Sequence, residues 1–188
     1  MMKETVKVGI IGSQFISTIH AESLMRCQSA EMLAVASPSV GNAKSFAAKH
    51  DIPHHFIDYR ELLAMAEIDM VVIGIPNHVH CEAVVAAAEA GKHIVIEKPL
   101  CLNMEEADLM VEAAKKANVK LMYAEELCFA PKYVRLKQLL DSGALGKPTL
   151  IKQSEKHDGP HAPHFWDVEQ SGGGVVMEMG CHAIEFFR

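Results

Sequence analysis

Aromatic residues and basic clusters are scarce in this sequence. Only 6% of its 188 residues are aromatic, with a single tryptophan, whereas 49% are hydrophobic. This composition supports a sizeable core and favours aliphatic packing of helices against strands over a β-sandwich. The formal net charge is -6 and no basic run is present, so we expect no nucleic-acid partner.

Long apolar runs and paired cysteines are also missing. No run approaches the ~20 apolar residues that a membrane helix needs, and the polar start of the chain does not resemble a signal peptide. The five cysteines are scattered and include no Cys-x-x-Cys pair. We therefore expect reduced thiols, a cytoplasmic location and no membrane partner.

Short apolar runs alternate with helical patterns along the first two thirds of the chain. We expect strands at 6–11, 31–36, 54–57, 69–75, 94–96 and 119–124, with helices at 15–27, 41–50, 59–65, 79–90 and 103–118. This alternation predicts an α/β fold built on a doubly wound parallel (Rossmann) sheet. Its switch point would lie between the first and fourth strands.

A second unit follows this sheet. A helix is predicted at 131–140, a turn-rich boundary at 142–148, a strand at 149–156, a polar loop at 157–174 and a helix at 175–188. We therefore assign residues 1–124 to the sheet domain. Residues 125–188 are assigned to the beginning of a second α/β domain.

Lys98 stands at the end of the fifth predicted strand. Pro99 cannot donate to a strand ladder and favours extended geometry at Lys98, so the strand stops there. Ligands of open α/β sheets bind at the carboxyl ends of the strands. An isolated Lys-Pro pair is more often a solvated strand end, but the neighbouring motifs favour a functional lysine.

The first strand ends at Gly12, where a dinucleotide fingerprint would lie. Only the first glycine of Gly-x-Gly-x-x-Gly is present, because Gln14 and Ser17 replace the other two. Taken by themselves, these residues are explained by a purely structural turn. Their position directly after the first strand favours phosphate binding instead. Ser37 follows the second strand in place of an acid that would bind the ribose of NAD, so the choice between NAD and NADP stays open.

Two further motifs allow a structural and a functional interpretation. Pro76 and Asn77 follow the fourth strand and could simply cap a helix, although they lie beside the switch point. Glu178 and His182 share a helix face at i,i+4 spacing, and a carboxylate-oriented histidine is a good general base. A surface pair is the ordinary alternative, but three glycines at 172–174 indicate close approach to a ligand.

Three histidines raise the question of a metal. His157, His161 and His164 are spaced three and four apart, with Asp158 and Asp167 nearby. The stretch is rich in proline and glycine rather than helical, so the spacing does not place the rings on one face. We expect no metal site.

Together these motifs resemble the Gfo/Idh/MocA oxidoreductases, relatives of glucose–fructose oxidoreductase and inositol dehydrogenase. The resemblance covers nearly the whole chain and is carried by the stretch 8–12 with His20, by 69–77 with His80, by 91–99, and by 172–182. It implies that 1–124 is an NAD(P)-binding Rossmann domain. Three departures are Gln14 for a glycine, Ser37 for an acid and Glu178 for an aspartate.

The resemblance also implies residue roles. The implied catalytic residues are Lys98, Glu178 and His182, with Glu178 orienting His182. The implied cofactor-binding residues are Gly12, Gln14, Phe15, Ile16, Ser37, Pro76, Asn77, His80, Glu97, Lys98 and Trp166.

The implied function is NAD(P)-dependent hydride transfer at a carbinol carbon of a sugar or polyol, by a homo-oligomer. An NAD-dependent glycosidase of the same family and a non-catalytic nucleotide-binding fragment are the alternatives. Family members continue into an open-faced sheet after the last predicted helix, so we expect the second domain to be truncated at Arg188 and catalysis by this chain to be poor.

Overall fold

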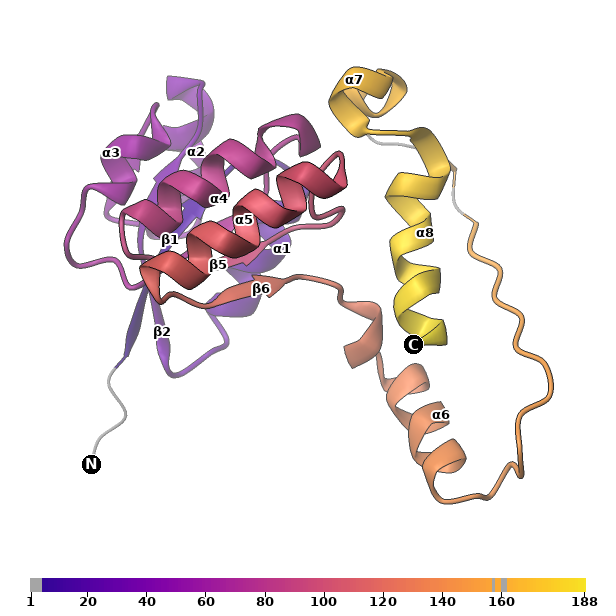
Figure 1. The fold of residues 1–188 in the computed structure, drawn as a ribbon. Helices are drawn as coiled ribbons and strands as arrows, with labels where there is room; N and C mark the ends of the chain where they lie inside the picture. Colours follow the sequence, from indigo (N-terminus) through magenta and orange to yellow (C-terminus); the bar gives the residue numbers. More distant parts are fainter. Residues whose placement is uncertain (1–4, 157, 160–161) are drawn as a thin grey trace.

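A six-stranded parallel sheet forms the centre of the molecule (Figure 1). The computed structural model describes residues 5–156, 158–159 and 162–188. The strand order is β3-β2-β1-β4-β5-β6, which confirms the doubly wound sheet and its switch point between the first and fourth strands. The strands are β1 (Val6–Ile11), β2 (Ala30–Ala36), β3 (His54–Phe56), β4 (Met70–Ile73), β5 (His93–Ile96) and β6 (Leu121–Tyr123).

Helices cover both faces of this sheet and continue into the C-terminal segment. The α-helices are α1 (Phe15–Leu24), α2 (Val40–Lys49), α3 (Tyr59–Leu63), α4 (His80–Glu89), α5 (Met104–Ala117), α6 (Pro131–Asp141), α7 (Val168–Ser171) and α8 (Gly174–Phe187). The 3-10 helices are η1 (Asn77–Val79), η2 (Leu127–Phe129) and η3 (Pro163–Trp166).

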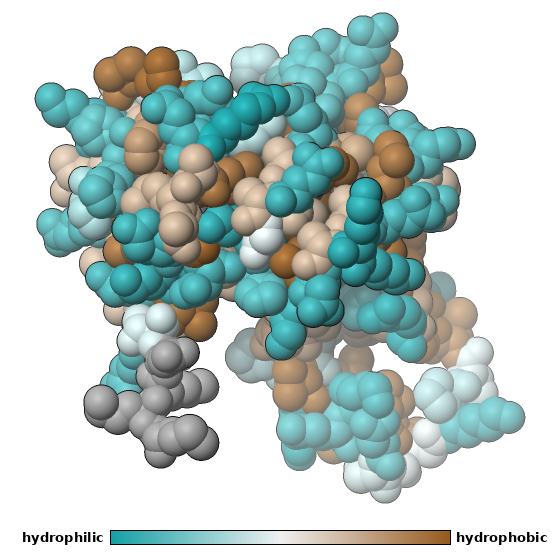
Figure 2. All heavy atoms as spheres, turned by 60° about the vertical axis from the view of Figure 1, so that its left-hand side comes forward, coloured by the Kyte–Doolittle hydropathy of each residue, from teal (hydrophilic) through white to brown (hydrophobic). Residues whose placement is uncertain are grey.

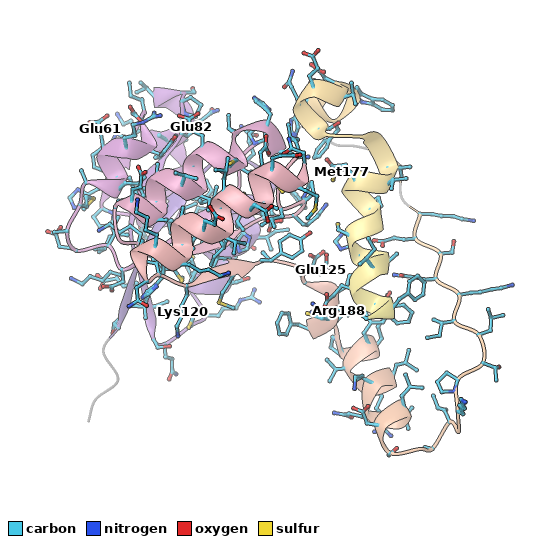
Figure 3. The ribbon with its side chains drawn as sticks, viewed as in Figure 1. Glu61, Glu82, Lys120, Glu125, Met177 and Arg188 are labelled. Atoms are coloured by element: carbon cyan, nitrogen blue, oxygen red, sulfur yellow. The ribbon has the colours of Figure 1, made fainter. Side chains whose placement is uncertain are left out.

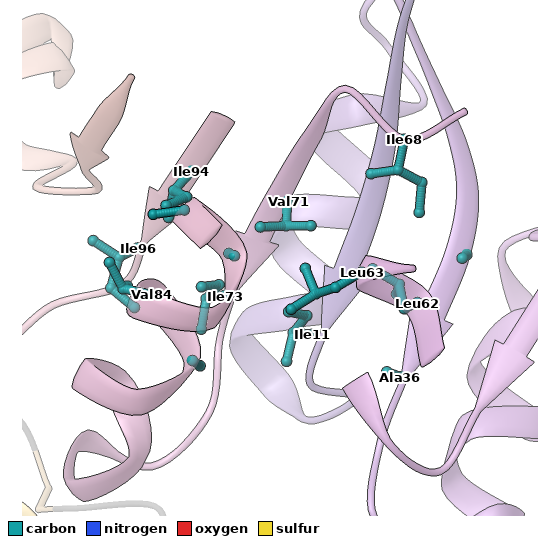
Figure 4. Close-up of a cluster of buried hydrophobic side chains, with 14 of the residues drawn as sticks. Ile11, Ala36, Leu62, Leu63, Ile68, Val71, Ile73, Val84, Ile94 and Ile96 are labelled. Atoms are coloured by element: carbon teal, nitrogen blue, oxygen red, sulfur yellow. The ribbon is translucent and has the colours of Figure 1, made fainter. Parts of the chain in front are cut away.

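Two apolar clusters hold the helices to the sheet. The larger one joins α3, α4 and α5 to one face, and the smaller one joins α1 and α2 to the other. Figure 4 shows Val84 of α4 beside Ile73, Ile94 and Ile96 of the strands, all of which are buried. Strands buried on both faces require continuous β-branched runs, which explains the apolar patterns in the sequence.

The strand register aligns the carboxyl ends of the strands along one side of the sheet, which we call the carboxyl edge. Ile11 lies opposite both Ala36 and Ile73, Ile73 lies opposite Ile96, and Ile96 lies opposite Tyr123. The residues that follow each strand therefore share this edge, and the chemistry-bearing motifs of the sequence are among them.

The outer face of the sheet domain is mostly hydrophilic, with scattered apolar side chains (Figure 2). All five cysteines are thiols. Within the described parts of the chain, no helix is both long and apolar enough to span a bilayer.

The predicted strand at 149–156 is wrong. The structure gives these residues no regular secondary structure, and Leu150 is 73% exposed. An extended segment becomes a strand only when a neighbour takes up its backbone hydrogen bonds, and none of the described strands pairs with it.

The predicted loop at 157–174 is only partly a loop. Residues 157 and 160–161 lie outside the described residues, but η3 and α7 form within the rest of this stretch. Pro163 opens η3, where its missing N–H costs nothing. The Asp167 carboxylate accepts a hydrogen bond from the Glu169 N–H at 3.0 Å and thereby caps α7.

Helix α8 packs against the chain that leaves β6. It contacts η2, and the Phe186 ring lies 4.9 Å from the Tyr133 ring of α6. Two polar residues of α8, Glu178 and His182, are buried, and they face the carboxyl edge of the sheet through the contacts described below.

Candidate active site

The turn after β5 is held by its own acidic residue. The backbone N–H of Lys98 donates to Glu97 Oε2 at 3.0 Å, and the other Glu97 oxygen lies 2.7 Å from His20 Nε2. The peptide bond between Lys98 and Pro99 is cis. Glu97 is buried, so this network positions the Lys98 backbone at the edge of the sheet.

His80 joins this turn to the end of β4. Its Nδ1 lies 2.9 Å from the Pro99 carbonyl oxygen, and its Nε2 lies 2.8 Å from the Ile75 carbonyl oxygen. The side chain is fully buried. Burial lowers the pKa of His80, while hydrogen bonds to the carbonyl oxygens of Ile75, Pro99 and Leu100 oppose that shift.

Asn77 ties α8 to the turn after β4. Its side-chain amide donates to Glu178 Oε1 at 2.6 Å and to the Ser171 carbonyl oxygen at 2.9 Å. All three residues are buried. Burial raises the pKa of Glu178, and the Asn77 hydrogen bond and the Lys98 ammonium act in the opposite direction.

Lys98 also faces α8. Its Nζ lies 3.4 Å from the Glu178 backbone oxygen, which is a long hydrogen bond. Thus Lys98, Asn77 and Glu178, three residues singled out in the sequence, converge at the carboxyl edge although they come from three different elements.

His182 has a partner other than the expected one. Its Nδ1 lies 2.7 and 2.8 Å from the two carboxylate oxygens of Glu125, whereas the Glu178 carboxylate accepts from Asn77. The expected orientation of His182 by Glu178 is therefore corrected, because Glu178 points toward η1. Sequence reasoning missed Glu125, although it closely follows β6 and so obeys the same strand-end rule as Lys98.

Tyr123 and Cys181 lie next to this pair. Burial raises the pKa of each, and a hydrogen bond between the two side chains partly offsets the shift of Cys181. Ligand atoms of Glu125, Cys181 and His182 lie within 4.8 Å of one another, and these are donor types that zinc accepts. Because burial disfavours the thiolate and Nδ1 already bonds Glu125, we interpret the cluster as a hydrogen-bonded network.

The turn after β1 contains four of the expected cofactor residues. Gly12 has a φ of 118°, and its N–H donates to the Ala36 carbonyl oxygen. Gln14 precedes α1 without making a side-chain cap, and no acidic residue lies in the first turn of that helix. Phe15 is 71% exposed and Ile16 is half-buried. An N-terminus without protein carboxylates suits a phosphate.

Ser37 lies at the end of β2 beside this turn. It is buried, and the Ser13 hydroxyl donates to Ser37 Oγ at 2.8 Å. The two hydroxyls therefore connect the first turn to the position where a ribose-binding residue would stand.

The remaining expected residues are less closely connected. Trp166 lies on η3 with 78% of its surface exposed. The backbone of Gly172 ends α7 with a φ of 88°, so local helix geometry already explains a glycine there. Of the three histidines considered as metal ligands, His157 and His161 lie outside the described residues.

Comparison with known proteins places the chain in a family. Residues 6–125 match the model of an oxidoreductase family with an NAD-binding Rossmann fold, GFO_IDH_MocA. Residues 133–188 match the GFO/IDH/MocA C-terminal domain. The chain belongs to the Gfo/Idh/MocA oxidoreductase family. Its N-terminal domain is thus of the NAD-binding type, as the resemblance in sequence implied.

Relatives in this family include enzymes with named substrates. Myo-inositol 2-dehydrogenase of Thermotoga maritima is 30% identical over 97% of this chain and 54% of its own length. The trans-1,2-dihydrobenzene-1,2-diol dehydrogenase of Xenopus tropicalis is 31% identical over 96% of this chain and 55% of its own. The chain thus spans about half the length of the curated relatives it matches.

Solved structures agree with this placement. A probable dehydrogenase from Thermotoga maritima superposes with a TM-score of 0.90 at 30% identity, over 97% of this chain and 54% of the other. Levoglucosan dehydrogenase in complex with NADH gives a TM-score of 0.86 at 28% identity, over 97% and 53%.

Proposed function

We propose that this chain binds NAD(P) and contributes to hydride transfer between the nicotinamide and a carbinol carbon of a sugar or polyol. The convergence of Lys98, Asn77 and Glu178 with the buried His182 at the carboxyl edge of the sheet carries the proposal. Relatives named for inositol, a diol and levoglucosan support hydroxylated small molecules as the substrate class. A homo-oligomer is part of the proposal only by family resemblance.

In this proposal the chain supplies position and charge. When bound, the nicotinamide accepts or donates the hydride. Lys98 polarises the substrate oxygen through its ammonium, and His182 accepts the hydroxyl proton as a neutral imidazole. Glu178 holds α8 to Asn77 and so sets how far His182 lies from Lys98.

The residues at the first turn fit a dinucleotide. The carboxylate-free N-terminus of α1 would hold the pyrophosphate, with Gly12 allowing close approach of the backbone. Pro76 and Asn77 sit on the adjacent strand end, where the nicotinamide half would lie.

Cofactor binding is the first prediction. Isothermal titration of the 188-residue chain with NAD(H) and NADP(H) should show saturable binding of at least one pair below about 1 mM, the upper end of ordinary cofactor and substrate constants. Absence of binding for both pairs at millimolar concentration would remove the dinucleotide interpretation. Net formation of NADH with a polyol would separate a dehydrogenase from a glycosidase, which consumes no net cofactor.

Cofactor choice is the second prediction. No carboxylate stands at Ser37 to repel a 2′-phosphate, so we expect a weak preference or one for NADP. Ser37→Asp should weaken NADP(H) binding about tenfold or more, since like charges at close range cost at least about 1.4 kcal/mol, while NAD(H) binding changes less. Ser29→Asp is the control. It adds the same charge immediately before β2, at the opposite end of that strand from Ser37, and should leave the ratio of NADP(H) to NAD(H) affinity unchanged.

Either of two results would show that Ser37 does not set the cofactor choice. A wild-type preference for NAD of about a hundredfold, or about 2.7 kcal/mol, would mean that other residues set the choice. Equal responses to Ser37→Asp and Ser29→Asp would mean that the charge does not act at the 2′ position.

A further inference from the structure

Glu125 and His182 form a buried pair between two distant parts of the chain. Glu125 closely follows β6, His182 lies on α8, and 57 residues separate them. Both side chains are 4% exposed, and the two Glu125 oxygens lie 2.7 and 2.8 Å from Nδ1. The Leu127 N–H donates to Glu125 Oε1 at 3.1 Å and fixes the carboxylate from the other side. Figure 3 shows Glu125 beside α8.

The chemistry of the two groups determines where the ring proton lies. A carboxylate only accepts hydrogen bonds, so the neutral imidazole facing it must hold its proton on Nδ1. Nε2 is then the atom left with a lone pair. We propose that Glu125 is the positioning residue of His182: it selects the Nδ1–H form, orients the ring and stabilises the imidazolium that forms when Nε2 takes a proton.

Glu178 does not compete for this role. Its carboxylate accepts the Asn77 amide at 2.6 Å, and burial raises its pKa, which disfavours the charged form. The i,i+4 spacing on α8 therefore places Glu178 and His182 on one side of the helix without pairing them. Glu178 holds the helix to the sheet, and Glu125 acts on the ring.

Other charged or titratable groups around the ring are few. Lys98 lies across from α8, and Tyr123 and Cys181 remain neutral near pH 7 because burial raises the pKa of both. The Glu126 carboxylate lies 4.0 Å from Nε2 but is 65% exposed, so water screens its charge. Among the described carboxylates that face His182, Glu125 is the one that is both buried and within hydrogen-bonding distance of the ring.

Histidine NMR of the whole chain tests this proposal without requiring turnover. In protein labelled with 15N-histidine, with His182→Asn to assign the signals, neutral His182 should show a protonated Nδ1 and a bare Nε2. Glu125→Gln keeps the shape but removes the charge, and its amide can either accept from Nδ1–H or donate to a bare Nδ1, so the His182 signals should show a mixture of the two tautomers. Glu185→Gln removes a carboxylate from the next turn of α8, where it pairs with Arg188, and should leave the Nδ1–H form of His182 unchanged.

Two results would overturn the role of Glu125. One is a wild-type His182 with its proton on Nε2, and the other is a Glu125→Gln variant whose His182 keeps the Nδ1–H form as fully as it does in Glu185→Gln. Thermal unfolding of each variant checks that the fold is retained. If Glu125→Gln does not fold, Glu125→Asp keeps the charge and should preserve the Nδ1–H form.

Kinetics connect the pair to catalysis, a step that rests on the proposed function. Glu125→Gln should lower kcat by about 10²–10⁴-fold with a small change in KM, because the base loses its oriented partner in the transition state. Glu125→Asp keeps the carboxylate and should recover part of the rate. An active wild type whose kcat is unchanged in Glu125→Gln would refute the positioning role. A chain that shows the NMR behaviour but oxidises no polyol would refute the proposed function, while the positioning of His182 by Glu125 would still stand.

Discussion

Replacing Lys98 with methionine is expected to lower kcat for polyol oxidation about 10²–10³-fold, the usual loss when one preorganised donor at a developing oxyanion is removed. Methionine is similar in length and apolar, so it deletes the ammonium and little else. The Lys98 side chain is half-buried and contacts the Glu178 backbone, which places its charge between the carboxyl edge of the sheet and α8. The Lys98 backbone is held independently by Glu97, so the turn should keep its shape.

The effect should appear in the chemical step. Cofactor affinity should change by less than about tenfold, or about 1.4 kcal/mol, because the phosphate contacts proposed above lie at the start of α1 rather than at Lys98. Loss of the ammonium also removes one of the two groups that oppose the raised pKa of Glu178, the other being the Asn77 amide, so any ionised Glu178 should become neutral at a higher pH.

Lys120→Met is a matched control. Lys120 is exposed and immediately precedes β6, at the opposite end of the sheet from the carboxyl edge (Figure 3). The control removes the same charge and should retain the wild-type rate. A Lys98→Met protein that keeps more than about a tenth of the wild-type kcat would exclude an electrophilic role for Lys98, since a single-donor loss is larger.

The sheet and much of the site could be predicted because both follow from local patterns. Buried parallel strands read as apolar runs such as 71–73 and 94–96, and each run ends near glycine or proline. The rule that ligands bind at carboxyl strand ends then pointed to Lys98 and Asn77, and the structure brings both to Glu178. Neither inference required knowledge of long-range contacts.

Glu125 could not be found in the same way. Its strand has only three residues, and Met122 and Tyr123 are 57% and 39% exposed, so the strand lacks the buried apolar run that drew attention to the ends of β4 and β5. Its partner, His182, lies 57 residues later in the chain. Glu178 is four residues from His182, so the helical spacing predicts Glu178 rather than Glu125 as the carboxylate that orients the ring. The prediction of a strand at 149–156 is wrong for a related reason. Whether an extended segment forms a strand depends on a neighbouring strand in the fold, which the segment's own sequence does not reveal.

Replacing Gly12 with alanine is expected to destabilise the protein by about 2–6 kcal/mol. This is the sum of about 1–3 kcal/mol for a side chain at positive φ and about 1–3 kcal/mol for overpacking. Gly12 has a φ of 118°, and an added Cβ would lie 2.9 Å from the Gly74 carbonyl carbon and overlap the carbonyl oxygen. Gly74 cannot readily move away, because its N–H donates to the Ile11 carbonyl oxygen at 2.8 Å.

The loss should reach the cofactor as well as the fold. Gly12 lies where β1 and β4 meet, so a shift of either turn displaces the start of α1 and the phosphate contacts proposed for it. A domain near the lower end of ordinary stability, about 5 kcal/mol, would lose much of its folded population if the loss is near the upper end of this range, whereas a domain near about 15 kcal/mol would stay folded. Chemical denaturation, followed by cofactor titration of the folded fraction, measures both effects.

Gly91→Ala separates strain from overlap. Gly91 also has a positive φ, 73°, but an added Cβ there meets nothing within 4 Å. It should therefore cost only the backbone strain of about 1–3 kcal/mol. If Gly12→Ala proves no more destabilising than Gly91→Ala, then the contact between the turn after β1 and the turn after β4 tolerates a side chain. Glycine would then be needed at the first turn for some reason other than close packing against Gly74.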